Sequence, residues 1–112
     1  MFSNATRRAL TSGTGLTIFA TLASATLAAG DAANGERIAQ RWCVACHVVS
    51  PDQPRATTEA PTFASIAQRS GFDAEKLAFF LLEPHPKMPN MSLTRREAVD
   101  LAAYIAKLGQ RQ

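Results

Sequence analysis

The clearest hydrophobic pattern lies near the C-terminal end of the chain and predicts a helix. Apolar residues recur there at intervals of three and four, which places them on one helical face: Ala98, Leu101, Ala102, Ile105 and Leu108. Thr94 and Glu97 have the spacing of a capping box, so we expect the helix to begin at this point. Asp100 and Lys107 are expected on its solvated side, and Gly109 in the left-handed conformation that often ends a helix.

A second helix is predicted at the start of the charged part of the chain, with Asp31 as its N-cap. The chain has helix formers and no proline as far as Trp42, and the helix is expected to stop after His47. Ile38 and Trp42 lie four residues apart and therefore share a face. Gly35 falls inside this helix, where glycine costs roughly 1 kcal/mol relative to alanine. We expect the missing side chain to let another helix cross closely.

The middle of the chain predicts a loop, a short apolar-periodic stretch and one further helix. Residues 48–60 have the proline-rich and polar composition of a loop, and a short apolar stretch over residues 63–67 follows, interrupted at Ser70 and Gly71. Asp73 can cap a further helix, which Pro84 and Pro86 end. Its apolar face is expected to comprise Leu77, Phe80 and Leu81, widened by Phe79 and Leu82. No segment has a convincing strand pattern, so the predicted fold class is all-α with about three to four short helices.

The first 30 residues have the order of a secretory signal peptide. Two arginines, Arg7 and Arg8, precede an uncharged run that extends to about Ala29 and ends in small residues. We therefore expect residues 1–30 to be a cleavable signal peptide, cut after Ala28, Ala29 or Gly30, and residues 31–112 to be one exported domain. The paired arginines are also compatible with a twin-arginine signal. A retained membrane anchor is the alternative, although the run is only mildly apolar.

Charge and size limit what the mature domain can be. After Gly30 the chain has ten Lys and Arg residues against nine Asp and Glu, so the mature net charge is close to zero. No basic stripe indicates nucleic acid or a membrane surface. A domain of about 80 residues buries little apolar surface without help, so a bound group that completes the core is expected.

The chemistry of the chain centres on Cys43-Val44-Ala45-Cys46-His47, a C-x-x-C-H motif that contains both of its cysteines. This spacing is typical of covalent c-type haem attachment. Each thiol of Cys43 and Cys46 can add to one vinyl group of the haem, and His47 is then held as an axial ligand of the iron. A redox dithiol, a structural disulfide or part of a zinc site are the alternatives. A zinc site needs about four ligands, and beyond the motif only His85 is an obvious candidate.

A second axial ligand has to come from a distant part of the chain. The candidates Met88, Met91 and His85 lie on a segment stiffened by three prolines in six residues. We favour Met88, because neighbouring prolines restrict its backbone, whereas Met91 lies nearer the last helix and can simply pack there. A Met/His pair raises the reduction potential of haem iron.

These features together resemble a class I c-type cytochrome, and the similarity is greatest to the short bacterial periplasmic monohaem members. The resemblance covers residues 31 to about 108 and rests on the C-x-x-C-H motif, Pro61, Met88-Pro89 and the closing helix with Leu101-Ala102-Ala103-Tyr104-Ile105. It implies the cytochrome c fold around one covalent haem c. It also implies that the first and last helices cross, with Gly35 and Ala39 against Leu101 and Tyr104. The carbonyl of Pro61 should then accept a hydrogen bond from Nδ1–H of His47, a contact that fixes the ring.

The function expected from this resemblance is one-electron transfer in the periplasm by a monomeric carrier that is not an enzyme. Two axial ligands leave no open position on the iron for a substrate. Unidentified redox proteins would be the partners, and electrons would pass near the attachment cysteines. Apolar side chains are expected to keep water from the haem: Ile66, Leu77, Phe80, Met91 and Leu101.

Three other functions remain open from the sequence. The chain can be a dedicated electron-accepting subunit of a dehydrogenase or oxidase. It can be a haem sensor or enzyme whose sixth ligand is labile, although no distal acid or base is evident. It can also be a thiol oxidoreductase that uses Cys43 and Cys46 without haem.

Overall fold

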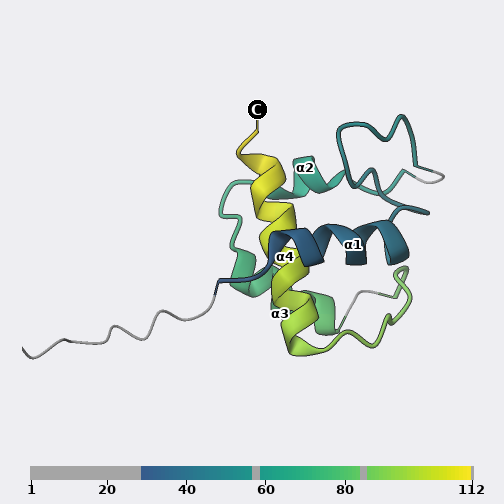
Figure 1. Ribbon diagram of the computed structural model, residues 1–112. Coiled ribbons are helices and arrows are strands. Elements are labelled where there is room, and N and C mark those ends of the chain that lie inside the picture. The colour runs from purple at the N-terminus through teal and green to yellow at the C-terminus, as the bar shows by residue number, and fades with distance from the viewer. Residues whose placement is uncertain (1–28, 57–58, 84–85, 112) are drawn as a thin grey trace, which may run out of the picture.

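The computed structural model describes residues 29–56, 59–83 and 86–111, which form four helices (Figure 1). They are α1 (Ala32–Trp42), α2 (Phe63–Ala67), α3 (Ala74–Leu82) and α4 (Arg95–Gly109). No strand occurs within these ranges, so the predicted all-α class is confirmed. Nearly all of the expected signal peptide, and His85, lie outside the described residues.

Each helix begins at a side chain that caps the first turn. Asp31 accepts a hydrogen bond from the Asn34 amide, and Asp73 accepts from the amides of Glu75 and Lys76. Thr94 and Glu97 form the predicted capping box. Thr62, which was not predicted as a cap, serves α2. Each cap is worth about 1 kcal/mol, so the helix starts are encoded locally.

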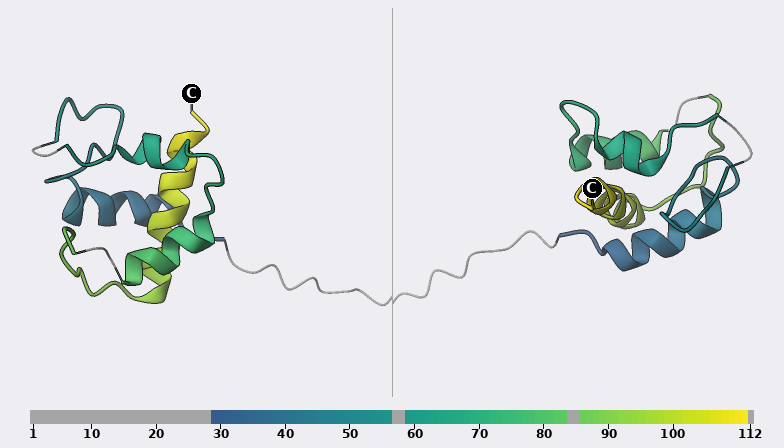
Figure 2. Two further views of the ribbon diagram at one scale, coloured as in Figure 1. Left: turned by 180° about the vertical axis from the view of Figure 1, so that it is seen from behind. Right: turned by 90° about the horizontal axis from the view of Figure 1, so that it is seen from above.

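Helix α4 is the centre of the fold. Seen from above, it runs between α1 on one side and α2 and α3 on the other (Figure 2). Its buried face contains the predicted apolar residues, and Leu101 and Ile105 are fully enclosed. The other three helices all pack on α4, so its amphipathic pattern organises the core.

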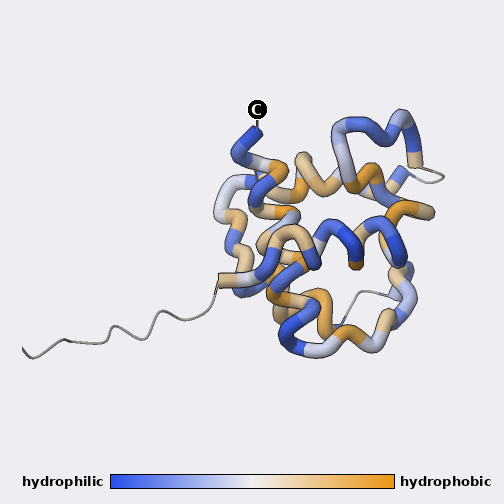
Figure 3. Tube along the Cα trace, viewed as in Figure 1, coloured by the Kyte–Doolittle hydropathy of each residue, from blue (hydrophilic) through white to orange (hydrophobic). Residues whose placement is uncertain are grey.

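The crossing of α1 and α4 depends on Gly35. A β-carbon at this position would collide with the backbone carbonyl of Asp100 and would lie 2.8 Å from Cβ of Tyr104. Ala39, one turn later, is completely buried. The close crossing expected from the sequence is therefore present. The exposed face of α1 is largely hydrophilic (Figure 3), as an amphipathic surface helix requires.

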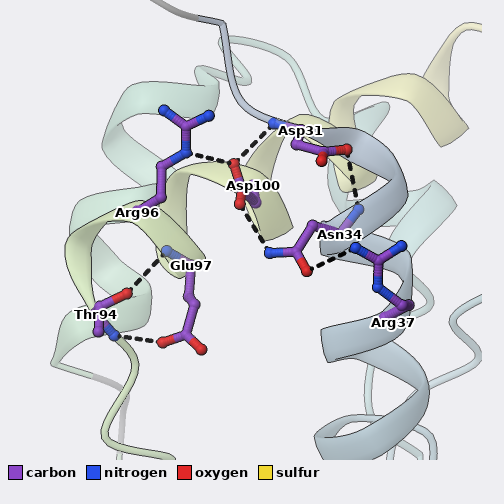
Figure 4. Close-up of polar contacts among 7 residues, drawn as sticks. All are labelled: Asp31, Asn34, Arg37, Thr94, Arg96, Glu97 and Asp100. Atoms are coloured by element: carbon purple, nitrogen blue, oxygen red, sulfur yellow. Dashed lines mark hydrogen bonds and ion pairs between the residues drawn. The ribbon is translucent and has the colours of Figure 1, made fainter.

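Asp100 was expected on the solvated side of α4, and this prediction is wrong. Its carboxylate is buried against α1, where Oδ1 accepts a 2.7 Å hydrogen bond from the Asp31 amide and Oδ2 accepts a 2.9 Å bond from Nδ2 of Asn34 (Figure 4). Arg96 forms an ion pair with it at 3.2 Å. Burial alone would raise the pKa of Asp100, but these hydrogen bonds and the nearby arginines together lower it below the ordinary value. Helical periodicity does not reveal that the start of α1 covers this position.

Gly109 was expected to end α4 in the left-handed conformation, and this prediction is also wrong. The helix includes Gly109 and is capped by Gln110, whose φ of −88° is right-handed. A β-carbon on Gly109 would lie 2.7 Å from Cβ of Ala67. Close packing against α2, rather than backbone conformation, therefore explains the glycine.

The predicted apolar face of α3 is rotated from the observed one. Ala78 and Leu81 are buried, whereas Phe79 is 77% exposed and Phe80 is 44% exposed. Leu77 and Leu82 are partly buried against the core. The run of four apolar residues at the end of α3 left the orientation ambiguous, and the small side chain of Ala78 faces the core because it permits closer packing.

Among the described residues, none of the four helices combines the length and apolar character needed to cross a bilayer.

We predict that Gly35→Ala lowers the free energy of unfolding. Helix propensity alone would raise it by about 1 kcal/mol. Overpacking against the backbone of α4 should cost about 3 kcal/mol, so we expect a net destabilisation of about 2 kcal/mol. Thermal or denaturant unfolding of the haem-loaded protein measures the sign. Gln40→Ala, at an exposed position of α1, is the control and should be nearly neutral. A stabilised Gly35→Ala protein would contradict the close crossing.

We predict that Asp100→Asn destabilises the protein at neutral pH by about 2 kcal/mol, because an amide replaces a buried carboxylate that accepts two hydrogen bonds. The pKa of Asp100 is lowered on folding. Its stabilisation is therefore complete above the ordinary aspartate pKa of 3.8 and is lost as the pH falls through the lower folded value. Denaturant titrations at several pH values should show the gap between variant and wild type closing in acid. Glu36→Gln, an exposed change on α1, should leave the pH dependence unchanged.

Candidate functional site

A cavity of about 600 Å³ lies where three segments of the chain meet. The end of α1 and the turn after it form one wall, residues 59–61 form a second, and residues 87–91 form a third. The loops that follow α1 and α3 lie on the same side of the molecule in Figure 1, beyond the C-terminal end of α1. The lining residues are Trp42, Cys43, Ala45, Cys46, His47, Glu59, Ala60, Pro61, Lys87, Met88, Pro89 and Met91. This volume falls within the range typical of cofactor sites.

The helix was expected to stop after His47, but α1 ends at Trp42, and the C-x-x-C-H motif continues the chain as a tight turn. The amide of Cys43 donates to Ala39 O at 2.9 Å, and the amides of Cys46 and His47 donate to Cys43 O at 3.1 and 2.9 Å. These bonds keep the chain coiled beyond the end of the helix. Residues three and four apart therefore come to one side, which is why Cys43, Cys46 and His47 all line the cavity.

The two cysteines have different surroundings. Cys43 is buried and Cys46 is exposed, and both are thiols. Burial, with a smaller contribution from the charge of Cys46, raises the pKa of Cys43 to about 11. The thiol of Cys43 is therefore neutral at physiological pH. Reactive cysteines of thiol oxidoreductases have lowered pKa values, so the environment of Cys43 does not favour that alternative.

The imidazole of His47 is buried and held from two sides. Its Nδ1 lies 2.6 Å from the carbonyl oxygen of Pro61, and its ring is tilted against Phe63 with 5.3 Å between centroids. A carbonyl can only accept, so Nδ1 carries the proton and Nε2 is left with a lone pair for a metal. This is the contact that the family resemblance implies. It fixes both the tautomer and the ring orientation.

The third wall brings both candidate methionines to the cavity. Met88 is partly buried and packs against the core, and Met91 also lines the cavity. The structure therefore brings both thioethers to the site of His47 without choosing between them. His85, the third candidate, lies outside the described residues.

The expected apolar lining is only partly observed. Met91 lines the cavity, whereas Ile66, Leu77, Phe80 and Leu101 are not among its lining residues within the described ranges. Leu101 is fully buried in the core between the helices instead. Residues missed from the sequence include Trp42, Glu59 and Lys87. Trp42 and Lys87 each precede a candidate site residue directly, which is the only sequence signal for them.

The donor set of the cavity fits a c-type haem. Two thiols, an imidazole and two thioethers face one space, and sulfur and imidazole are the groups that hold haem through its vinyl carbons and its iron. Among the described residues, no three side chains of His, Cys, Asp or Glu come together as a possible metal site, as zinc would need.

Comparisons with known proteins agree with this chemistry. The family described as cytochrome c oxidase, cbb3-type, subunit III, matches residues 30–105. The chain is also 54% identical over 85 residues to cytochrome c-552 of Bradyrhizobium diazoefficiens, a match that covers 76% of this chain and 82% of that relative. No solved structure gives a significant match. The chain belongs to this cytochrome c family, and it is a class I c-type cytochrome with one covalent haem c.

Proposed function

We propose that this protein is a periplasmic one-electron carrier whose haem iron is bound by His47 and Met88. The observation that supports the proposal is the shared cavity, which joins the C-x-x-C-H turn to the Met88 loop, about 40 residues further along the chain. Family membership makes a haem c electron carrier the function of the chain at the coarser level. The ligands, the compartment and the partners are the parts that we propose here.

This proposal assigns a role to each of the candidate haem-binding residues. Cys43 and Cys46 would hold the haem through two thioether bonds, and Nε2 of His47 would be a ligand of its iron. The bound haem supplies the one-electron chemistry of its iron. Pro61 orients the imidazole through its carbonyl, and the soft thioether of Met88 favours the reduced metal and so raises the potential.

Two protein ligands leave no vacant position for oxygen or a substrate, which suits a carrier better than an enzyme. The buried His47 ring and the proline-flanked Met88 loop limit rearrangement between oxidation states. Electrons would enter and leave beside Cys46, because Cys46, Ala45 and Trp42 are exposed at the cavity.

The guanidinium of Arg41 lies 4.9 Å from the centroid of the Trp42 ring and covers part of this indole.

A dedicated subunit is the second candidate function, because the matching family is described as a subunit of cytochrome c oxidase. The match to cytochrome c-552 favours a separate carrier, since it covers 82% of a protein that is named as a cytochrome alone. Native purification distinguishes the two: a carrier should elute as a monomer, and a dedicated subunit should elute with its enzyme.

The test of the proposed function is an intact mass and an absorption spectrum of the protein purified from the periplasmic fraction of a host that attaches haem c. We predict the mass of one haem plus a chain beginning at residue 29, 30 or 31. We also predict a low-spin spectrum in both oxidation states, because both axial positions are occupied. A colourless protein that still melts cooperatively would refute the proposal. A haem protein that retains residues 1–28 would refute cleavage alone.

We predict that Met88→Ala abolishes the weak near-infrared absorption band of Fe(III)–sulfur ligation and lowers the reduction potential, because the thioether is removed. Met91→Ala is the matched control, since Met91 lines the same cavity on the same loop. The control should keep the band. The reverse result would make Met91 the ligand. Carbon monoxide binding to the reduced wild-type protein at neutral pH would instead indicate a labile sixth position.

A further inference from the structure

The described residues between His47 and α2, 48–56 and 59–62, contain no helix or strand that would satisfy their backbone. The amide of Phe63 donates to the carbonyl of Val48 at 3.0 Å, and the carbonyl of Pro61 accepts from His47. The bond to Pro61 therefore depends on how firmly the backbone of His47 is held.

One side chain, Gln53, joins the loop to the turn. Its Oε1 accepts from the amide of Val49 at 2.9 Å. Its Nε2 faces three carbonyl oxygens, at 2.9 Å from His47, 3.2 Å from Arg55 and 3.3 Å from Val44. The amide orientation is unambiguous, because a flipped side chain would place its oxygen against three acceptors and its nitrogen against a donor.

Tyr104 of α4 holds the same segment from the other side. Its hydroxyl donates to the carbonyl of Val49 at 2.6 Å, and both residues are buried. Burial raises the pKa of Tyr104, so the phenol remains protonated and keeps its donor. Both backbone polar groups of Val49 are thus bonded, one to Gln53 and one to the central helix.

His47 is therefore fixed through its backbone as well as its ring. We propose that Gln53 is a positioning residue for the axial histidine: its amide holds the carbonyl of His47 against the backbone of Val49 and Arg55, so that the ring stays in place for the Nδ1–H bond to Pro61. This inference rests on the proposed ligation by His47. Groups that bond to a metal-ligating histidine set the orientation and basicity of its ring.

The proposal predicts the direction of the change when Gln53 is lost. A looser backbone at His47 lets the ring move away from the carbonyl of Pro61, which weakens the Nδ1–H bond, and the imidazole then donates less electron density. Oxidised iron is stabilised less, so the reduction potential should shift to more positive values. The Nδ1 proton, no longer protected by a short hydrogen bond, should exchange faster with solvent.

The experiment compares haem-loaded Gln53→Leu and Gln53→Glu with the wild type. Leucine removes all four hydrogen bonds at similar volume. Glutamate keeps the acceptor for Val49 but loses the donors to the carbonyls, so it tests the half of the amide that contacts His47. The readouts are the reduction potential, the exchange rate of the His47 Nδ1 proton by NMR of the reduced protein, and the near-infrared band. Thr94→Ala, which removes the α4 cap far from this loop in sequence, is the control for general destabilisation.

Both Gln53 variants should speed exchange while keeping the near-infrared band, the uncharged Gln53→Leu should also shift the potential upward, and Thr94→Ala should lower only the melting temperature. Wild-type exchange in either Gln53 variant, or a wild-type potential in Gln53→Leu, would overturn the positioning role and leave Gln53 as a loop stabiliser. If Gln53→Leu does not retain haem, the exchange rate of the Nδ1 proton in Gln53→Glu decides whether Gln53 positions His47. Failure of the proposed ligation is separate, because the wild type itself would then lack the band or the protected proton.

Discussion

The contact on which the structure depends is the crossing of α1 and α4 at Gly35. It brings the backbone of one helix against the backbone of the other and leaves no room for a side chain. Asp100 reinforces the crossing by binding the Asp31 amide and Asn34 at the start of α1. Because α1 is fixed along its length, the place where it ends is fixed too. The cysteines and His47 follow immediately, so this crossing positions the haem-binding turn.

The same central helix holds the chain again after the turn. Tyr104 lies one turn of α4 beyond Asp100, and its hydroxyl binds the carbonyl of Val49. The five-residue motif is thus held between two attachments to α4, one before it and one after it. Gln53 and Pro61 then connect the intervening backbone and ring. A network in which every buried side-chain nitrogen and oxygen of the described residues has a partner favours a single arrangement.

Features set by neighbouring residues could be predicted from the sequence, and features set by distant packing could not. The caps Asp31, Asp73 and Thr94 and the C-x-x-C-H turn are local, and the helices begin where they indicate. Asp100 looked solvent-exposed because periodicity within α4 contains no information about what covers it. Gly109 looked like a helix end because its contact with Ala67 comes from another element. The role of Gln53 could not be predicted, because nothing in the sequence of a proline-rich loop indicates the hydrogen bonds that its side chain forms in the fold.

Because this domain is small, its covalently attached haem matters for stability as well as for function. The buried residues gather around α4, and the cavity of about 600 Å³ lies beyond the end of α1 at the side of that cluster. A domain this small has little apolar surface to spare, so the group that fills the cavity contributes to stability as well as to function. Rigid packing around the metal also serves transfer, because a site that changes little between oxidation states loses little energy to rearrangement. The hydrogen bond between His47 and Pro61 and the packing of Met88 against the core therefore support the fold and the redox function at once.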